Sequence, residues 1–338
     1  MEKDLNNRLK DWKKIRNKID GYNYISTFEK IMLCRYLVKL IDYIDIYNNG
    51  FDYYYEKIIF VLHLAKKDYP KFYSGFDYKK ECIFKNKLKQ VLITKINALK
   101  HKKSPIESKI NFISNLYGLN KFEYEFLVYY ILKNINSYIG NISAFFNINY
   151  KEEKFAIFGI QILELKIWEI KQIKKELFKK GVLIKQKYSD SEFVLNSRIL
   201  ETFWNPKLKN ETQIKNFLLG KNQKSELNWK DFEHLTKERN IALNILTSAI
   251  KNHAKGINIL LYGSVGTGKT QFAKLIANKA KCDMYSVSAE FMDKEASRKD
   301  RLSDLSSKQT ILSKSTNSCL LFDEAEDVMN RGFTEFGN

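Results

Sequence analysis

Residues 257–270 of this chain read INILLYGSVGTGKT, and this stretch decides how the C-terminal part of the sequence is interpreted. Its last eight residues match the pattern G-x-x-x-x-G-K-[ST] in full. The apolar run of residues 257–262 before them predicts a short buried strand, and residues 271–280 after them predict an amphipathic helix. A glycine-rich turn between a strand and a helix is typical of loops that hold phosphate groups.

The residue types in this turn fit phosphate chemistry. Glycines let successive backbone N–H groups point into one concavity, and the helix that begins near Lys269 adds the positive end of its dipole. Lys269 is expected to place its charge on the β- and γ-phosphates, and the Thr270 hydroxyl to complete the shell of a Mg²⁺ ion. We therefore predict ATP with Mg²⁺ as the ligand. The residues expected to bind it are Gly263, Ser264, Val265, Gly266, Thr267, Gly268, Lys269 and Thr270.

A second motif, CLLFDE, occupies residues 319–324. Its apolar part predicts a strand that delivers two carboxylates at its C-terminal end, where ligands gather in open α/β sheets. Asp323 is the expected Mg²⁺ ligand, directly or through water. Glu324 is the expected catalytic base, which polarises the water that attacks the γ-phosphate while Lys269 acts on the phosphates. The alternative is an acidic cap on a buried strand, because further acidic residues follow at once.

The sequence around the two motifs alternates between helix and strand. Residues 231–254 and 301–313 predict helices, and residues 284–287 predict a second strand between the two motifs. Alternation of this kind implies a parallel sheet with right-handed crossovers. The expected fold is a mostly α N-terminal region followed by an α/β P-loop NTPase module.

The stretches INILLYGSVGTGKTQFAKLIA (257–277) and CLLFDEAEDV (319–328) together resemble the AAA+ ATPases. The subgroup they resemble most is a bacterial one with a large helical N-terminal region ahead of a single ATPase module. The resemblance covers residues 229–331 and implies ATP hydrolysis. It places residues 231–235 near the adenine pocket. It leaves Arg301 and Asp304 as surface or intersubunit residues, for which an ordinary exposed helix is the simpler expectation.

The chain departs from this family at its C-terminal end, because it stops at Asn338, shortly after Asp323. The family normally continues with two more strands, a sensor residue, an arginine finger and a helical lid. We therefore expect an ATPase module that is incomplete after the Walker B strand, which is the strand that carries the CLLFDE motif. The chain would then be a truncated or split ATPase. Residues 257–262 should then lack both neighbouring strands, while the second and third strands still pair. Hydrolysis by the chain alone should be negligible, since a missing arginine finger costs ~10³–10⁵ in rate.

The rest of the chain divides by its patterns. Residues 1–150 are expected to form a helical domain, with turns at residues 48–50 and 70–75, and residues 204–228 a linker. Residues 151–203 give a helix that stops at Gly181, a strand, a polar turn at residues 189–191 and a second strand, which is the outline of a winged helix. A partial ATPase domain is expected over residues 229–338.

Composition bounds the possible partners. The net charge of +19 is concentrated in residues 1–220, so nucleic acid is a possible partner of the N-terminal region, although a solvated lysine-rich face explains the charge equally well. The four cysteines form no CxxC pair, which makes disulfides and zinc improbable and fits a reducing cytoplasm. No signal peptide or membrane span is expected.

Three functions stay open at this point. The first is an ATP-driven remodeller of proteins or complexes, which assembles as a ring and grips a protein substrate through its helical region. The second is a nucleic-acid-binding ATPase of initiator or transposition-helper type, in which Lys171, Lys174 and Lys175 face DNA. The third is an inactive truncated remnant.

Overall fold

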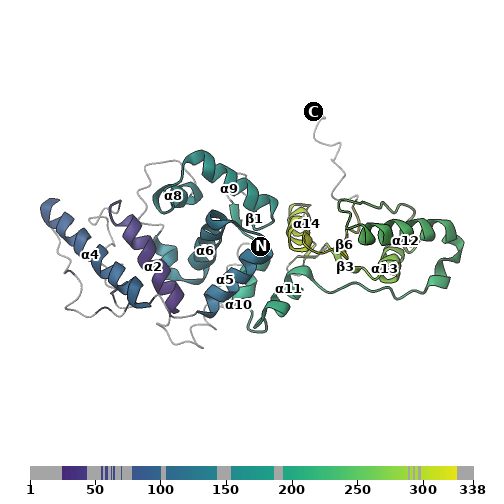
Figure 1. Ribbon diagram of the computed structural model, residues 1–338, viewed down its shortest axis with the longest axis horizontal. Coiled ribbons are helices and arrows are strands. Elements are labelled where there is room, and N and C mark those ends of the chain that lie inside the picture. The colour runs from purple at the N-terminus through teal and green to yellow at the C-terminus, as the bar shows by residue number, and fades with distance from the viewer. Residues whose placement is uncertain are drawn as a thin grey trace. The chain divides into compact units, whose positions relative to one another are not determined.

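The computed structural model describes residues 25–43, 55, 58, 59, 62, 64, 70, 78–99, 104–142, 154–185, 193–287, 290, 291, 294, 295 and 298–325 (Figure 1). The chain forms two compact units. The N-terminal unit consists of Met1–Leu177 and Lys185–Pro206, and the C-terminal unit of Phe178–Ile184 and Lys207–Asn338. The expected turn at residues 48–50, most of that at residues 70–75, and the polar turn at residues 189–191 lie outside the described residues.

The described residues before the glycine-rich stretch are mostly helical, as expected. The helices up to Trp204 are α2 (Thr27–Leu40), α4 (Tyr78–Leu99), α5 (Pro105–Leu116), α6 (Lys121–Ile135), α7 (Ser137–Ile142), α8 (Lys154–Gln161), α9 (Ile167–Lys179) and α10 (Ser197–Trp204). Strands β1 (Leu183–Lys185) and β2 (Phe193–Leu195) form a two-stranded sheet. The helix, glycine and two strands of the winged-helix outline are therefore present, while the assignment as a winged helix remains a prediction.

Aromatic side chains form the core of the N-terminal unit. Phe158 of α8 stacks on Tyr129 of α6 with 4.0 Å between the ring centroids. Tyr36 of α2 and Phe126 of α6 meet the Phe158 ring edge-on at 5.6 and 5.3 Å. Aromatic pairs in these two geometries add to the free energy gained from burial alone. This cluster ties three helices that are distant in sequence into one core.

Helix starts in this unit follow the expected chemistry. Asn120 is the N-cap of α6, and its side chain accepts hydrogen bonds from the backbone N–H groups of Phe122 and Glu123. Glu123 returns a bond by accepting from the backbone N–H of Asn120, which completes a capping box. Such a cap satisfies donors that the first turn of a helix cannot pair internally.

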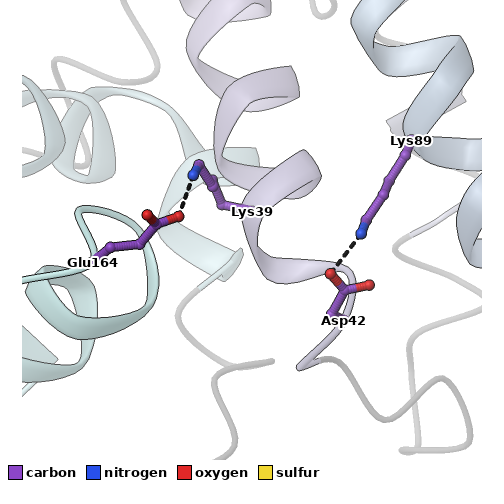
Figure 2. A network of polar contacts seen from close by, with 4 residues as sticks. All are labelled: Lys39, Asp42, Lys89 and Glu164. Carbon is purple, nitrogen blue, oxygen red and sulfur yellow. Dashed lines mark hydrogen bonds and ion pairs between the residues drawn. The ribbon is translucent and has the colours of Figure 1, made fainter.

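Ion pairs on the surface of this unit link its elements (Figure 2). Lys39 of α2 pairs with Glu164, and Lys89 of α4 pairs with Asp42 at 2.5 Å. Exposed pairs of this kind contribute about 0–1 kcal/mol each, so the aromatic core and not the surface charges holds this unit together.

The C-terminal unit contains a small parallel sheet. Strand β3 (Asp283–Ser286) pairs with β6 (Ser318–Leu321), with Met284 opposite Cys319. Helices α12 (Thr236–Lys251) and α13 (Lys269–Lys279) lie on one side of this pair and α14 (Arg298–Leu312) on the other (Figure 1). The remaining elements are the 3₁₀ helix η1 (Trp229–Leu235), helix α11 (Glu211–Leu219), and strands β4 (Glu290–Phe291) and β5 (Lys294–Glu295), which pair antiparallel.

The expected linker, residues 204–228, contains helix α11, which begins with a capping box at Asn210. One expectation for this unit is wrong. Residues 257–262 form no strand, and Leu260 and Tyr262 are 76% and 88% exposed. A strand is defined by hydrogen bonds to a neighbour, and within the described residues no strand lies beside this segment. The expectation that the second and third strands pair with each other is confirmed by β3 and β6.

Candidate functional site

The glycine-rich loop leads directly into α13. Gly268 is the N-cap of this helix and has φ +81°, while Gly266 has φ +83°, both in the left-handed region that favours glycine. A Cβ atom on Gly268 would lie 3.5 Å from the Phe232 ring of η1. That distance is an ordinary van der Waals contact, so the loop needs glycine at this position for its backbone conformation and not for lack of space.

The lysine of the motif folds back onto the loop. Its Nζ donates to the backbone carbonyls of Gly263 at 3.0 Å and Ser264 at 2.9 Å. The Thr267 hydroxyl also donates to the Ser264 carbonyl, at 2.9 Å. The rest of the loop is open to solvent, and Val265 is 99% exposed.

The two motifs meet through a hydrogen bond between the residues expected to hold the metal ion. The Thr270 hydroxyl, in the first turn of α13, donates to a carboxylate oxygen of Asp323 at 2.8 Å. Asp323 follows β6 and lies at the C-terminal end of the β3–β6 pair. Two side chains that are 53 positions apart in sequence are thus brought into contact.

The second carboxylate of the motif has an unusual backbone. Glu324 has φ +50°, in the left-handed region, and its side chain is exposed. Its backbone N–H donates to the other carboxylate oxygen of Asp323 at 3.2 Å. A non-glycine residue in this region carries a conformational cost and persists where its surroundings hold it. The turn that carries both carboxylates is therefore fixed by contacts outside the motif.

Arg301 of α14 supplies those contacts, and the expectation that it is a surface residue is wrong. It is only 4% exposed, and its guanidinium donates to the backbone carbonyls of Asp323 and, at 3.1 Å, Glu324. It also lies 4.6 Å from the centroid of the Phe322 ring. Asp304, on the same helix, is buried as well and pairs with Lys308. A polar stripe at helical spacing was the only signal in the sequence, and it does not separate a buried face from a solvated one.

The segment before η1 also contacts the helix that follows the loop, which sequence analysis missed. The Gln271 side chain accepts hydrogen bonds from the Glu226 backbone N–H at 3.1 Å and from the Ser225 hydroxyl at 3.3 Å. Phe232 packs edge-on against Phe272 at 5.3 Å between ring centroids. These contacts place η1, where the adenine pocket was expected, beside Gly268; the adenine contact itself stays a prediction.

The donor set at the junction fits a hard cation. In the part of the chain that the structure describes, no group of three or more His, Cys, Asp and Glu side chains could hold a metal ion. Mg²⁺ does not require such a cluster, because it binds through one or two carboxylates together with waters and substrate phosphates. The hydroxyl of Thr270 and the carboxylate of Asp323 are oxygen ligands of this type, so they fit Mg²⁺ as ATP delivers it.

Four cysteines are free; Cys319 lies in β6, and Cys282 directly precedes β3. The Cys282 and Cys319 thiols share a hydrogen bond, which lowers the pKa of Cys282 and raises that of Cys319. Both pack on the face of the β3–β6 pair that is covered by α13. They therefore belong to the packing behind the site and not to the site itself.

The lysines expected to face nucleic acid lie on α9. Lys171 and Lys175 are exposed, whereas Lys174 is half-buried with its Nζ 4.3 Å from the centroid of the Phe193 ring. Ile170, Ile173 and Leu177 form the buried side of the helix. The arrangement is that of an amphipathic helix with one wet face. Among the described helices, none is long and apolar enough to cross a membrane.

Comparison with known proteins bears on the C-terminal part of the chain. Residues 259–337 match the model of the family described as ATPase family associated with various cellular activities (AAA). Searches of curated proteins and of solved structures gave no match. The matched residues contain the whole glycine-rich loop with Thr270, and also Asp323 and Glu324. The match supports membership of the AAA family, and with it nucleotide binding and ATPase-type activity in general.

Proposed function

We propose that this chain binds ATP with Mg²⁺ at the junction of the glycine-rich loop and the end of β6. The observation that carries the proposal is the 2.8 Å hydrogen bond between the Thr270 hydroxyl and the Asp323 carboxylate. Each motif alone is a sequence pattern, but the contact joins a phosphate-type loop to an acidic strand end. The AAA match over both motifs supports the same ligand.

Different residues of the site are proposed to bind the phosphates, hold the metal ion and activate water. Backbone N–H groups at the start of α13 and the Lys269 ammonium group bind phosphate oxygens. Thr270 and Asp323 would hold the Mg²⁺ ion, which would neutralise charge that develops on the phosphates. Glu324, which is exposed beside Asp323, accepts a proton from water or orients it for attack on the γ-phosphate.

Binding is tested by titrating the purified chain with a fluorescent ATP analogue, with and without Mg²⁺. Lys269→Ala should weaken binding roughly ten- to a hundredfold, the range for losing charge-assisted hydrogen bonds. Lys251→Ala is the matched control, because Lys251 is an exposed lysine on the neighbouring helix α12 and its loss should change nothing.

Asp323→Asn keeps the shape of the side chain and removes its negative charge. It should abolish the gain in affinity that Mg²⁺ gives the wild-type chain, while affinity for metal-free ATP is retained. Equal affinities of wild type and Lys269→Ala would sink the proposal, as would the absence of saturable binding by the wild-type chain.

The role of the bound nucleotide is the second part of the proposal. In this chain it drives remodelling of a protein partner that the helical N-terminal unit engages, within a larger AAA assembly. Of the three lysines expected to face nucleic acid, Lys174 is half-buried against the Phe193 ring, which leaves Lys171 and Lys175 as the exposed ones. A DNA affinity that falls steeply with salt, and falls again when Lys171 and Lys175 are neutralised, would replace this part of the proposal with the nucleic-acid function.

A further inference from the structure

Helix α14 turns a charged side toward the carboxyl ends of both strands of the parallel sheet. Lys308 is 1% exposed and its Nζ donates to the carbonyl of Ser286, the last residue of β3, at 2.6 Å. Arg301 donates to two carbonyls just beyond the end of β6. These contacts go to backbone atoms at strand ends, which is where the candidate site lies.

The guanidinium group of Arg301 donates to two successive backbone carbonyl oxygens. The carbonyls of Asp323 and Glu324 belong to the two peptide planes on either side of the Glu324 Cα atom. The orientation of these two planes defines φ and ψ of Glu324, whose φ is +50°. A guanidinium group is planar and carries its donors in a fixed fork, so one Arg side chain can fix both planes at once. The Phe322 ring, 4.6 Å from the guanidinium carbon, holds the fork in place.

We propose that Arg301 is a positioning residue for the nucleotide site, which keeps the Asp323–Glu324 turn in the conformation that aims Asp323 at Thr270. The inference rests on the proposed function. It assigns to Arg301 an effect through the backbone of the two carboxylates and no contact with nucleotide. Losing the fork releases Glu324 from its left-handed conformation, and the peptide that carries Asp323 turns with it.

An electrostatic role and a positioning role for Arg301 predict opposite changes in Mg²⁺ binding when the residue is replaced. A buried positive charge close to a cation site repels the cation, so its removal should strengthen Mg²⁺ binding if charge alone matters. Removal should weaken Mg²⁺ binding if Arg301 positions Asp323. The measured quantity is the Mg²⁺ enhancement, the ratio of the affinity for ATP with Mg²⁺ to the affinity for ATP without it, taken on the full chain with the fluorescent ATP analogue.

Arg301→Met removes the fork and keeps most of the side-chain volume. We expect its Mg²⁺ enhancement to fall roughly tenfold or more, the scale of one charge-assisted hydrogen bond, while affinity for metal-free ATP stays within about twofold of wild type. Arg301→Lys keeps the charge but has no planar fork, so it should lose several-fold of the enhancement and fall between wild type and Arg301→Met.

The control for stability is the double variant Asp304→Asn with Lys308→Met. It alters two buried charged residues of the same helix, which pair with each other at 2.8 Å while Lys308 also donates to the carbonyl of Ser286. It should change the denaturation midpoint and leave the Mg²⁺ enhancement as in wild type. A structural role for α14 in general would instead lower the enhancement in the control as well.

Each outcome decides something. A folded Arg301→Met chain with unchanged or increased Mg²⁺ enhancement overturns the inference. If that variant does not fold, Arg301→Lys decides, and an enhancement equal to wild type overturns the inference in the same way. A wild-type chain that shows no ATP binding contradicts the proposed function itself, which distinguishes the two failures.

Discussion

Helices α6 and α14 are both 15 residues long, yet they are held in opposite ways. In α6 the buried residues are almost all apolar or aromatic, and they enter the core that Tyr129 and Phe158 form. In α14 the buried residues are polar or charged with one exception. They are Arg301, Asp304, Ser307, Lys308 and Ile311.

The difference separates two uses of a helix. Apolar burial is non-directional and contributes stability in proportion to the area removed from water. A buried charge gains little net free energy, because its desolvation cost offsets the attraction, but its hydrogen bonds have direction. The contacts of α14 therefore determine where backbone carbonyls lie at the strand ends. Helix α6 therefore mainly stabilises its unit, whereas α14 positions the backbone at the ends of β3 and β6.

The largest effect is expected from a substitution that removes the buried ion pair of α14. Lys308→Met removes the ammonium group that pairs with the buried Asp304 carboxylate and donates to the Ser286 carbonyl, so the free energy of unfolding of the C-terminal unit should fall by about 3–5 kcal/mol. Adding Asp304→Asn should restore much of that loss. Denaturant unfolding followed by hydrogen exchange of α14 measures both; a single variant no weaker than the double would contradict the assignment.

A comparable but smaller loss is expected from the apolar face of α6. Ile131 is fully buried, and Ile131→Ala should cost about 2–5 kcal/mol through lost transfer free energy and the cavity that is left. Ile311→Ala on α14 is the counterpart, and it should cost less because Ile311 is the one apolar residue buried there. Equal losses in the two helices, measured by denaturant titration, would remove the distinction between them.

A third test asks whether the helix starts also differ between the two units. Asn120 caps α6 and Asn210 caps α11, each by accepting from the backbone N–H three residues on. Replacing either by Ala should cost about 1 kcal/mol, because the same orphan donor loses its acceptor. A similar loss at both positions would show that the contrast lies in packing. Thermal unfolding of the two variants against wild type measures it.

The smallest effect concerns pH. Burial raises the pKa of Glu125, a half-buried residue of α6, against the opposing charges of Arg35 and Lys121. A raised folded-state pKa means that the protonated form favours folding, so the contribution is present at low pH and is lost as pH rises through that pKa. Glu125→Gln should therefore be slightly more stable than wild type at pH 7. The difference should vanish near pH 4, which melting temperatures at the two pH values will reveal.

Much of the local structure could be predicted from the sequence, because it depends on neighbours along the chain. The helix that stops at Gly181 and the two strands that follow it are confirmed. The contact between Thr270 and Asp323 agrees with their expected shared role as ligands of one Mg²⁺ ion, and the structure brings these side chains together. Their roles toward ATP and Mg²⁺ remain predictions.

The features that escaped prediction depend on partners distant in sequence. Residues 257–262 have the composition of a buried strand, but a strand forms only where a neighbouring backbone supplies hydrogen bonds. Arg301 and Lys308 look like a solvated stripe, since helical spacing of charges is the same whether water or strand ends face them. The pairing of β3 with β6 was predictable because it followed from topology and not from composition.

The segment between α11 and η1 forms hydrogen bonds with β3 and so limits where a further strand can pair with the sheet. Asn222 forms an antiparallel bridge with Tyr285, and the Gln223 backbone N–H donates to the Met284 carbonyl at 2.7 Å. The Asn222 side chain also accepts from the Met284 N–H at 3.0 Å and donates to Asp283 at 2.7 Å. This segment occupies the edge of β3 that does not pair with β6, so another strand cannot pair there. An additional strand of this sheet would therefore have to pair with the edge of β6 that lies away from β3.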